Sequence, residues 1–265
     1  MDNIQENGVH KLYKKLGETP RESILRYKTA NPDLRGLSMT YVGRLDPMAE
    51  GLLLVLSGEA ISEKEKYLNL PKIYEFEILW EFETDTADIL GLVKGDDISI
   101  FPTESDVEKN LKNFSGKFEQ LYPAYSSQPV DGPSPDGGRT SKPLIQWSRE
   151  GRIGEIKIPA HEVEIFSAEY ISRRFETGGD LLKTIQSGIN LVLGDFRQEK
   201  ILKEWQNALM LNFDRQYAID KIKINVSGGF YVRQLVSDLA KSLGAKACVF
   251  HILRTEIGEY KIEEK

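Results

Sequence analysis

The segment KIYEFEILWEFET alternates apolar and polar side chains with a period of two. In the strand that this pattern predicts, one face carries Tyr74, Phe76, Ile78 and Trp80, and the other face carries glutamates. A strand with one apolar face packs that face on a core and leaves the other face in a polar environment. The segment is therefore predicted to be a half-buried strand of a sheet.

Two helix starts are marked by capping residues. In TPRESILRY, Thr19 can cap the helix, Pro20 takes its first position and Glu22 completes a capping box. In SDVEKNLKNF, Ser105 and Glu108 repeat the same spacing. Both segments are predicted to be helices.

The remaining pattern mixes strands and helices along the whole chain. A loop at Ser38–Glu50 leads into the apolar run Leu52–Leu56, which is predicted to be a buried strand. The other expected elements are a charged helix over 59–68, a short helix ending at 151, a strand region over 153–171, helices over 180–193 and 198–211, a strand–turn–helix unit over 221–244 and a strand region over 247–262. Because regular βαβ alternation is missing, an α+β domain around a large mixed sheet is expected.

The segment Ser126–Pro143 is rich in Pro, Gly and Ser and is the longest irregular stretch of the chain. This composition suits a linker or a mobile functional loop. The segments on both sides carry related signals, so it is interpreted as an excursion within one domain over 10–265. Residues 1–9 are expected to form a flexible tail.

Composition excludes some classes of function but does not identify the function of the chain. The chain has 265 residues, 35 Lys and Arg against 41 Asp and Glu, and a net charge of −6, which argues against holding nucleic acid by bulk positive charge. One cysteine excludes an internal disulfide, and three scattered histidines argue against a closed zinc site. The polar N-terminus and the lack of a long apolar run predict a cytoplasmic protein with no membrane association.

Three residues are candidates for chemistry. Asp46 lies in VGRLDPMAEGLLLVL, in a turn made rigid by Pro47 and followed by the buried strand. Arg233 falls in the first turn of a helix, where a cation is disfavoured, so a carboxylate partner is expected. Tyr74 begins the alternating strand.

Each candidate also has an ordinary structural explanation, as a turn, a surface arginine or a core tyrosine. The segment ETDTADILG is dense in acids and hydroxyls, which suits a metal site or an acid/base pair. A self-hydrogen-bonded polar turn is the preferred interpretation of that segment. The motifs GxGxxG, GxxxxGK[ST], HExxH and CxxC are absent from the sequence.

Taken in order, four motifs resemble those of the TruB-type tRNA pseudouridine synthases. They are VGRLDPMAEGLLLVLSGEA, then PKIYEFEILWEFETDTADILG, then YPAYSSQPVDG with SKPLIQWSREG, then VSGGFYVRQLVSDLAKSLG with LRTEIGEY. The resemblance extends from about Leu12 to Tyr260, and the ordered set is far more specific than any single motif.

The resemblance implies an RNA-modifying isomerase that converts uridine to pseudouridine, most typically in the T-loop of tRNA, without cofactor or metal. It also implies a mixed, mostly antiparallel sheet with an active cleft across its middle. Asp46 matches the family's catalytic aspartate, which attacks C1′ of the ribose or C6 of the uracil. Arg233 would keep that carboxylate ionised, and Tyr74 would stack under the flipped base.

Four further residues are expected to contact the RNA: Tyr41, Arg44, Tyr231 and Lys142. Tyr41 replaces the His of the family loop G-H-T-G-T-L-D-P and is expected to fill the gap left by the flipped base. Arg44 makes the loop GRLD, a feature similar to the RluA and RsuA branches, which work largely on ribosomal RNA. The Lys of the family's YSA-x-K segment is absent, so RNA contacts there are assigned to Arg139 or Lys142.

Other functions remain open at this level. One is modification of another RNA such as rRNA, and a second is a non-catalytic tRNA-binding or folding factor. A small-molecule enzyme is favoured only by the acidic composition. For the leading hypothesis, the T-arm of tRNA is the expected substrate, the protein is expected to be a monomer, and no C-terminal PUA domain is expected.

Overall fold

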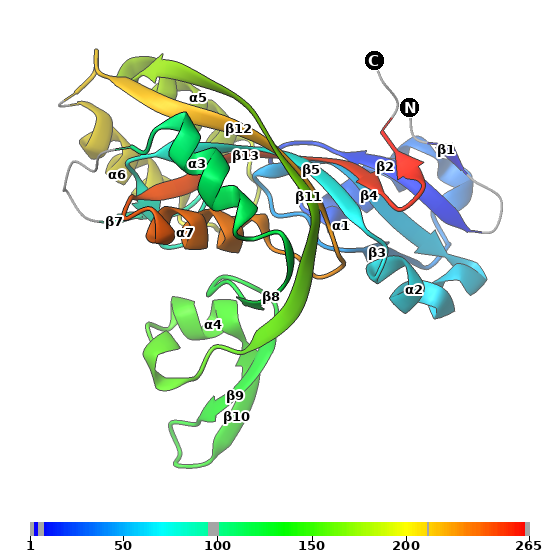
Figure 1. The fold of residues 1–265 in the computed structure, drawn as a ribbon. Coiled ribbons are helices and arrows are strands. Elements are labelled where there is room, and N and C mark those ends of the chain that lie inside the picture. The colour runs from blue at the N-terminus through cyan, green and yellow to red at the C-terminus, as the bar shows by residue number, and fades with distance from the viewer. Residues whose placement is uncertain (1–2, 5–7, 95–100, 211, 263–265) are drawn as a thin grey trace.

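The computed structural model describes residues 3–4, 8–94, 101–210 and 212–262. Within these residues ten strands form one sheet in the order β1-β2-β4-β13-β5-β12-β11-β8, with β3 paired to β4 and β14 paired to β13 (Figure 1). The strands are β1 (Asn3–Ile4), β2 (Val9–Lys14), β3 (Met39–Val42), β4 (Ala49–Ser57), β5 (Lys72–Trp80), β8 (Gly116–Leu121), β11 (Ala160–Thr177), β12 (Gln216–Val226), β13 (Ala247–Ile257) and β14 (Tyr260–Lys261). Among the strands of this described part, only β13 and β4 pair with each other in parallel, and one isolated parallel bridge joins Asp88 to Val249 of β13. The expected α+β fold on a mixed, mostly antiparallel sheet is confirmed.

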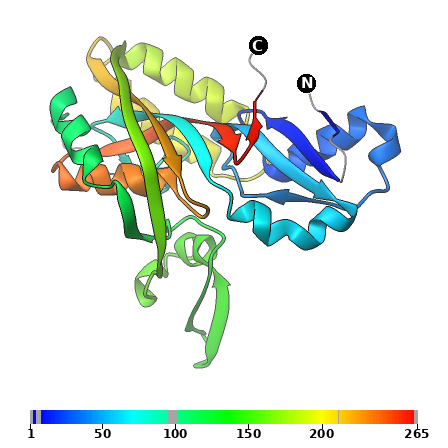
Figure 2. The same ribbon diagram turned by 45° about the vertical axis from the view of Figure 1, so that its right-hand side comes forward.

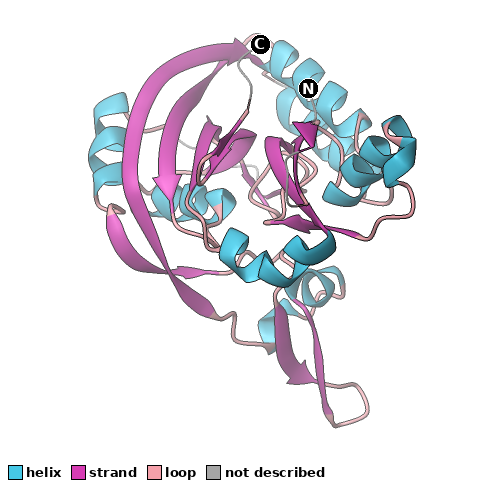
Figure 3. Cartoon of the chain, turned by 90° about the vertical axis from the view of Figure 1, so that its right-hand side faces the viewer, coloured by secondary structure: helices cyan, strands magenta, loops and turns pink. Residues whose placement is uncertain are grey.

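Helices cover both faces of the central strands. α3 (Glu104–Lys112) and α7 (Val232–Ser242) pack on one face, and α5 (Gly178–Asn190) and α6 (Gln198–Met210) pack on the other (Figures 1 and 3). The remaining helices are α1 (Pro20–Ala30), α2 (Lys64–Leu68), α4 (Leu144–Arg149) and the 3-10 turns η1 (Pro32–Leu34), η2 (Gly58–Glu63) and η3 (Ile153–Glu155). No helix in the described ranges combines the length and the apolarity needed to cross a lipid bilayer.

The period-two pattern of β5 is explained by its central place in the sheet. Tyr74, Phe76, Ile78 and Trp80 are all buried in the core beneath α3 and α7, as the alternation predicts. Leu79 points the opposite way, into the core beneath α5 and α6. β5 therefore packs against the helices on both faces of the sheet, and its first residues, which include Tyr74, are held rigidly.

The apolar run of β4 is buried on both faces. Leu52, Leu54 and Leu56 join the core formed with η2 and α2, whereas Leu53 and Val55 face Leu12 and Tyr27 on the side of α1. A strand covered on both sides needs apolar residues at every position rather than at alternate ones. This explains why the chain turns directly from a polar loop into a continuous Leu/Val run.

The Pro/Gly-rich segment is more regular than its composition predicts. β9 (Pro129–Pro133) and β10 (Arg139–Pro143) form an antiparallel hairpin, which α4 follows. This unit projects from the sheet between β8 and β11 (Figure 1), and the long strand β11 connects it back to the main body (Figure 2). The hairpin closes across the loop 134–138, in which Gly137 adopts a φ of 87° that favours glycine.

Several element boundaries differ from the sequence prediction. The expected helix over 59–68 is divided into η2 and α2, and the strand expected over 153–171 begins at Ala160 and continues to Thr177. Residue 211, the last of an expected helix, lies outside the described residues, as do 1–2 and 5–7 of the expected tail. The described Asn3–Ile4 pairs with β2, so that part of the tail is a strand.

The capping prediction is confirmed for α1 and wrong for α3. Thr19 and Glu22 form both bonds of a capping box at the start of α1. At α3 the cap is Thr103, whose hydroxyl accepts the backbone N–H of Asp106 at 3.2 Å. Ser105 is the second residue inside the helix and not the residue that flanks it, so it is not placed to cap the first N–H groups.

We expect Thr103→Ala to lower the free energy of unfolding by about 1 kcal/mol, because it leaves an N–H group of α3 without a partner. Urea denaturation followed by circular dichroism measures this change. Ser105→Ala is the matched control and should change the free energy of unfolding by less than about 0.5 kcal/mol. A larger loss for Ser105→Ala than for Thr103→Ala would contradict the assigned cap.

Candidate active site

The loop that carries Asp46 connects β3 to β4 and is held by buried cations. The ammonium of Lys14 donates to the carbonyls of Pro47 (3.4 Å) and Ala49 (2.5 Å). Arg254 donates to the carbonyl of Gly43 at 3.2 Å, on the other side of Asp46. Burial lowers the pKa of Lys14 to about 8, although the Asp46 charge works against this shift. The backbone on both sides of Asp46 is therefore fixed from inside the protein.

Arg233 is the partner of Asp46. Its Nε lies 2.8 Å from Oδ2 of Asp46, and its side chain is only 4% exposed, against 30% for Asp46. Among the described residues, no hydrogen bond reaches the second oxygen of Asp46, Oδ1. One carboxylate oxygen of Asp46 is thus bound to Arg233, and the other is left to accept a further contact.

The rest of the Arg233 guanidinium is held by backbone carbonyls. Nη1 donates to the carbonyl of Thr86 at 2.7 Å, and Nη2 donates to the carbonyl of Tyr125 at 3.2 Å. Burial opposes the charge of Arg233, but the carboxylates of Asp46 and Asp88 outweigh it and raise its pKa above the usual value. The expected carboxylate partner of this early-helix arginine is present.

The helix start behind Arg233 depends on two glycines. A Cβ on Gly228 would lie 2.5 Å from the carbonyl oxygen of Leu68, and Gly229 adopts a φ of 80°. The turn places Tyr231 at the N-cap of α7, where its backbone N–H donates to Gln120 and its carbonyl accepts from Gln120 (2.9 and 3.1 Å). Arg233 therefore enters the site from a helix whose first turn is fixed on both sides.

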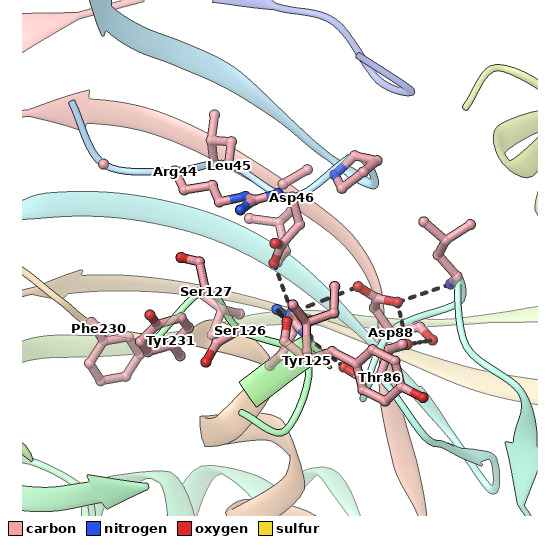
Figure 4. Close-up of a pocket in the computed structure, with 18 of the residues that line it drawn as sticks. Arg44, Leu45, Asp46, Thr86, Asp88, Tyr125, Ser126, Ser127, Phe230 and Tyr231 are labelled. Atoms are coloured by element: carbon pink, nitrogen blue, oxygen red, sulfur yellow. Dashed lines mark hydrogen bonds and ion pairs between the residues drawn. The ribbon is translucent and has the colours of Figure 1, made fainter. Parts of the chain in front are cut away.

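Asp88 is a second carboxylate at this centre. Its Oδ2 lies 3.7 Å from Nε of Arg233, and its Oδ1 accepts bonds from the hydroxyl of Thr86 (2.7 Å) and the N–H of Leu90 (3.0 Å). Burial raises the pKa of Asp88 to about 6, against the opposing effect of Arg233. Asp46 and Asp88 thus approach one guanidinium from different segments (Figure 4).

These groups line a pocket of about 360 Å³. Tyr74 and Leu45 both line the pocket. Phe230 and Tyr231 lie next to each other in the lining, and Tyr125, Ser126 and Ser127 approach from the base of the projecting unit (Figure 4). Among the described residues the pocket also has a basic lining: Arg44, Lys72, Arg149, Arg197, Arg233 and Arg254. This local excess of cations exists although the whole chain carries a net charge of −6.

The residues predicted to act on the base and the RNA divide into two groups. Asp46, Tyr74, Arg233, Arg44 and Tyr231 all line the pocket. Arg44 is exposed there and makes no hydrogen bond or ion pair with the residues that the structure describes. Burial and the Asp46 charge raise the pKa of Tyr231 to about 12, so its hydroxyl keeps its proton at neutral pH.

Tyr41 and Lys142 are not part of the pocket lining. Tyr41 packs beside the core under α1, with the ammonium of Lys64 at 5.8 Å from its ring centroid. Lys142 pairs with Glu150 and lies over the Trp147 ring at 4.1 Å, with a side chain only 11% exposed. Both side chains are used in local packing, and their predicted RNA contacts stay predictions.

The segment ETDTADILG holds the Arg233 guanidinium, a contact that its sequence pattern does not predict. Its turn is indeed self-hydrogen-bonded, since the hydroxyl of Thr84 donates to the carbonyl of Asp88 at 2.7 Å. The same turn aims Asp88 and the carbonyl of Thr86 at Arg233. The density of acids was the available signal, but it did not show that a buried arginine lay opposite. No cluster of three or more His, Cys, Asp or Glu suited to a metal ion occurs in the described part of the chain.

Residues 34–178 match the family model described as TruB family pseudouridylate synthase (N terminal domain). A tRNA pseudouridine synthase B of Treponema pallidum (strain Nichols) is 29% identical over 225 residues, which cover 84% of this chain and 53% of the relative. The corresponding protein of Bordetella avium (strain 197N) is 26% identical over 259 residues, covering 97% and 83%. The chain spans about half the length of the first of these relatives.

Two solved structures are similar in fold. A chain of a Cbf5-Nop10-Gar1 complex matches with a TM-score of 0.54 and 16% identity, over 97% of this chain and 51% of that chain. A chain of an H/ACA RNP bound to a substrate RNA containing 2′-deoxyuridine matches with a TM-score of 0.52 and 16% identity, over 97% and 49%. At this identity, the similarity shows a shared fold.

The raised pKa of Asp88 predicts a specific pH dependence of stability. Between the ordinary aspartate pKa of about 4 and the native value of about 6, the native state binds a proton that the unfolded chain has released. Linkage then favours folding as the pH falls through this window. We expect the wild type to gain stability relative to Asp88→Asn between about pH 7 and about pH 4.5, measured by urea unfolding. A difference between the two proteins that stays flat, or shrinks as the pH falls, would exclude this assignment.

Proposed function

The chain belongs to the TruB family of pseudouridylate synthases, and on this basis we propose that it isomerises uridine to pseudouridine in RNA. The observation that carries the proposal is the state of the Asp46 carboxylate. One of its oxygens is bound to a buried arginine, and the other has no hydrogen bond to a described residue. A carboxylate that is fixed in place and still accessible is suited to act as a nucleophile.

The reaction places defined demands on the site. The N1–C1′ bond of uridine breaks, the base turns, a C5–C1′ bond forms, C5 loses its proton and N1 gains one. A carboxylate adds either to C1′ or to C6 and leaves again when the new bond has formed, so no outside co-reactant is required. Asp46 is the proposed nucleophile, and both points of attack remain consistent with its position.

The neighbours of Asp46 support this assignment. Arg233 compensates the negative charge in a largely enclosed setting, where such compensation is stronger than in water. Tyr74 is buried in the pocket wall and is proposed to support the uracil ring by stacking. The volume of about 360 Å³ is in the range of sites that enclose a small group, such as one flipped nucleotide.

We propose tRNA as the substrate and the uridine of its T-loop as the target, in the cytoplasm. The relatives named tRNA pseudouridine synthase B support tRNA, and the basic lining of the pocket supports a polyanionic ligand. Because the net charge is −6, affinity for RNA should depend on few phosphate contacts and fall steeply with salt.

Asp46→Asn is expected to lower the single-turnover rate of pseudouridine formation by roughly a thousandfold or more, because the amide cannot replace the nucleophile. RNA affinity, measured by filter binding, should stay within about twofold, since the substitution nearly preserves shape. Pseudouridine is detected by carbodiimide treatment and primer extension.

Asp33→Asn, at an exposed position of η1, is the matched control and should leave turnover unchanged. Residual activity of Asp46→Asn close to that of the wild type would exclude Asp46 as the nucleophile. Binding without any product in the wild type would favour the non-catalytic RNA-binding factor instead.

The substrate is tested with three transcripts: a whole tRNA, its isolated T-arm and a ribosomal RNA fragment. We expect modification of the T-loop uridine in the first two and none in the third. Changing that uridine to cytidine should abolish the signal, and raising the salt concentration should weaken binding linearly on a double-logarithmic plot. Product in the ribosomal fragment with none in tRNA would assign the protein to another RNA.

A further inference from the structure

The connection between β11 and β12 reaches the pocket, although these two strands are neighbours in the sheet. Instead of a short turn, the chain forms α5 and α6, which pack on the sheet through a shared core. The segment between the two helices contributes Phe196 and Arg197 to the pocket lining. A helical excursion between two adjacent strands therefore adds a wall to the site.

The backbone of Arg197 is in the left-handed region, with a φ of 66°. For a residue with a Cβ this conformation is unfavourable, and it persists only where the surroundings impose it. Here Asp195 accepts the N–H of Arg197 at 3.2 Å, and Gln198 accepts the N–H of Phe196 at 2.9 Å. Gln198 also donates to the carbonyls of Val192 and Gly194. These hydrogen bonds fix the backbone of the segment, so that the side chain of Arg197 is directed toward Asp85.

The Arg197 side chain completes a closed triad with an acid and a tyrosine. Its Nη1 lies 2.7 Å from Oδ2 of Asp85 and 3.1 Å from the hydroxyl of Tyr125, and its Nη2 lies 3.3 Å from Oδ1 of Asp85. The Tyr125 hydroxyl donates to Asp85 at 2.7 Å, and the guanidinium lies 5.0 Å from the centroid of its ring. Burial favours the neutral form of Asp85, but the bonds from Arg197 and Tyr125 prevail and lower its pKa.

Two members of this triad are joined directly to the groups that hold Arg233. Asp85 precedes Thr86, whose carbonyl accepts Nη1 of Arg233, and the carbonyl of Tyr125 itself accepts Nη2. Arg197 therefore links the segment of Asp85 and Thr86 to the segment of Tyr125. These two segments supply the carbonyls that orient the guanidinium of Arg233 beside Asp46.

We propose that Arg197 is a positioning residue of the active site: through Asp85 and Tyr125, it fixes the two carbonyls that orient Arg233, and with them the reactive carboxylate. This role rests on the proposed function. The helical excursion α5–α6 is accordingly part of the catalytic framework, because it supplies Arg197, which fixes the positions of Asp85 and Tyr125.

The competing role for Arg197 is direct contact with an RNA phosphate, as for an ordinary basic residue of the pocket. Against it, both Nη atoms already bind Asp85, and the side chain is only 28% exposed. The two roles predict different measurements. A positioning residue affects the rate at saturating enzyme, whereas a phosphate contact affects affinity and its salt dependence.

Arg197→Gly is the sharpest variant, since glycine accepts the left-handed backbone and only the side chain is lost. We expect the single-turnover rate at saturating enzyme to fall roughly 10- to 100-fold with the RNA dissociation constant unchanged. Asp85→Asn should have a similar effect, and the double variant should be little worse than either single one, because all three break one network. An unchanged rate, or a weaker affinity with a salt slope reduced by about one, would overturn the proposal.

A spectroscopic measurement separates this proposal from the proposed function. In a ¹⁵N correlation spectrum, the Nε–H signal of Arg233 is assigned by its loss in Arg233→Lys. It should shift or broaden in Arg197→Gly and in the milder Tyr125→Phe, whether or not the wild type forms pseudouridine. If the wild type makes no product, the proposed function fails, and the Nε–H signal alone decides the role of Arg197. An unmoved signal in both variants overturns it.

Arg215→Ala is the matched control from the end of the same excursion. Arg215 pairs with the carboxylate of Glu81, which is itself buried, and does not line the pocket. The control should lower the melting temperature while leaving the rate and the Arg233 signal in place. A control that reproduces the effects of Arg197→Gly would show that they arise from general destabilisation and would overturn the proposal.

Discussion

The interaction on which the site depends is that between the buried Arg233 guanidinium and its acceptors. A buried cation is costly unless its charge is compensated and its N–H groups are satisfied. Here Asp46 lies 2.8 Å from Nε, Asp88 lies 3.7 Å away, and the carbonyls of Thr86 and Tyr125 take the remaining contacts. Removing any one acceptor would leave a polar group unpaired in the interior, so these segments are coupled in stability as well as in position.

Much of the fold serves to bring those acceptors together. The segments concerned are far apart in the chain, since Asp46 and Arg233 are separated by 187 positions and Tyr125 and Arg233 by 108. The sheet provides the common frame. β4 places the Asp46 loop beside β13, β5 places Tyr74 at the pocket wall, and β12 leads through two glycines into α7. Each of these side chains thus extends from, or from a loop beside, a rigid strand or helix. Such support is the condition for a well-oriented functional group.

Charge is arranged differently near the pocket and over the whole molecule. The chain is acidic, yet the buried cations Lys14 and Arg254 hold the Asp46 loop, and basic residues, among them the exposed Arg44 and Arg149, line the pocket. The N–H groups of the buried cations Lys14, Arg233 and Arg254 donate mainly to backbone carbonyl oxygens, and Asp46 and Asp88 compensate the charge of Arg233. A locally basic cavity in an acidic protein suits a polyanion that is bound at one point and released again.

The sequence by itself determined the elements whose signals are local. The alternation in β5, the capping box of α1, the rigid Asp46-Pro47 turn and the expectation of an acid partner for Arg233 all depend on neighbours a few residues away. The sequence also favoured the α+β class, since strands and helices intermix without a βαβ order. In each case the side-chain pattern and the backbone preference point to the same structure.

Only the tertiary structure decided which polar residues surround Asp46 and Arg233 in the pocket. The sequence presents Asp85 and Asp88 as parts of a self-bonded turn and does not distinguish Arg197 from other arginines; their roles appear only when the sheet brings α7 and the α5–α6 excursion around them. Conversely, Tyr41 and Lys142 lie outside the pocket lining, one packed beside a core and the other in an ion pair, and their predicted RNA contacts remain predictions. The physical reason is common to both groups: burial and charge pairing depend on contacts between distant segments, which no local pattern specifies.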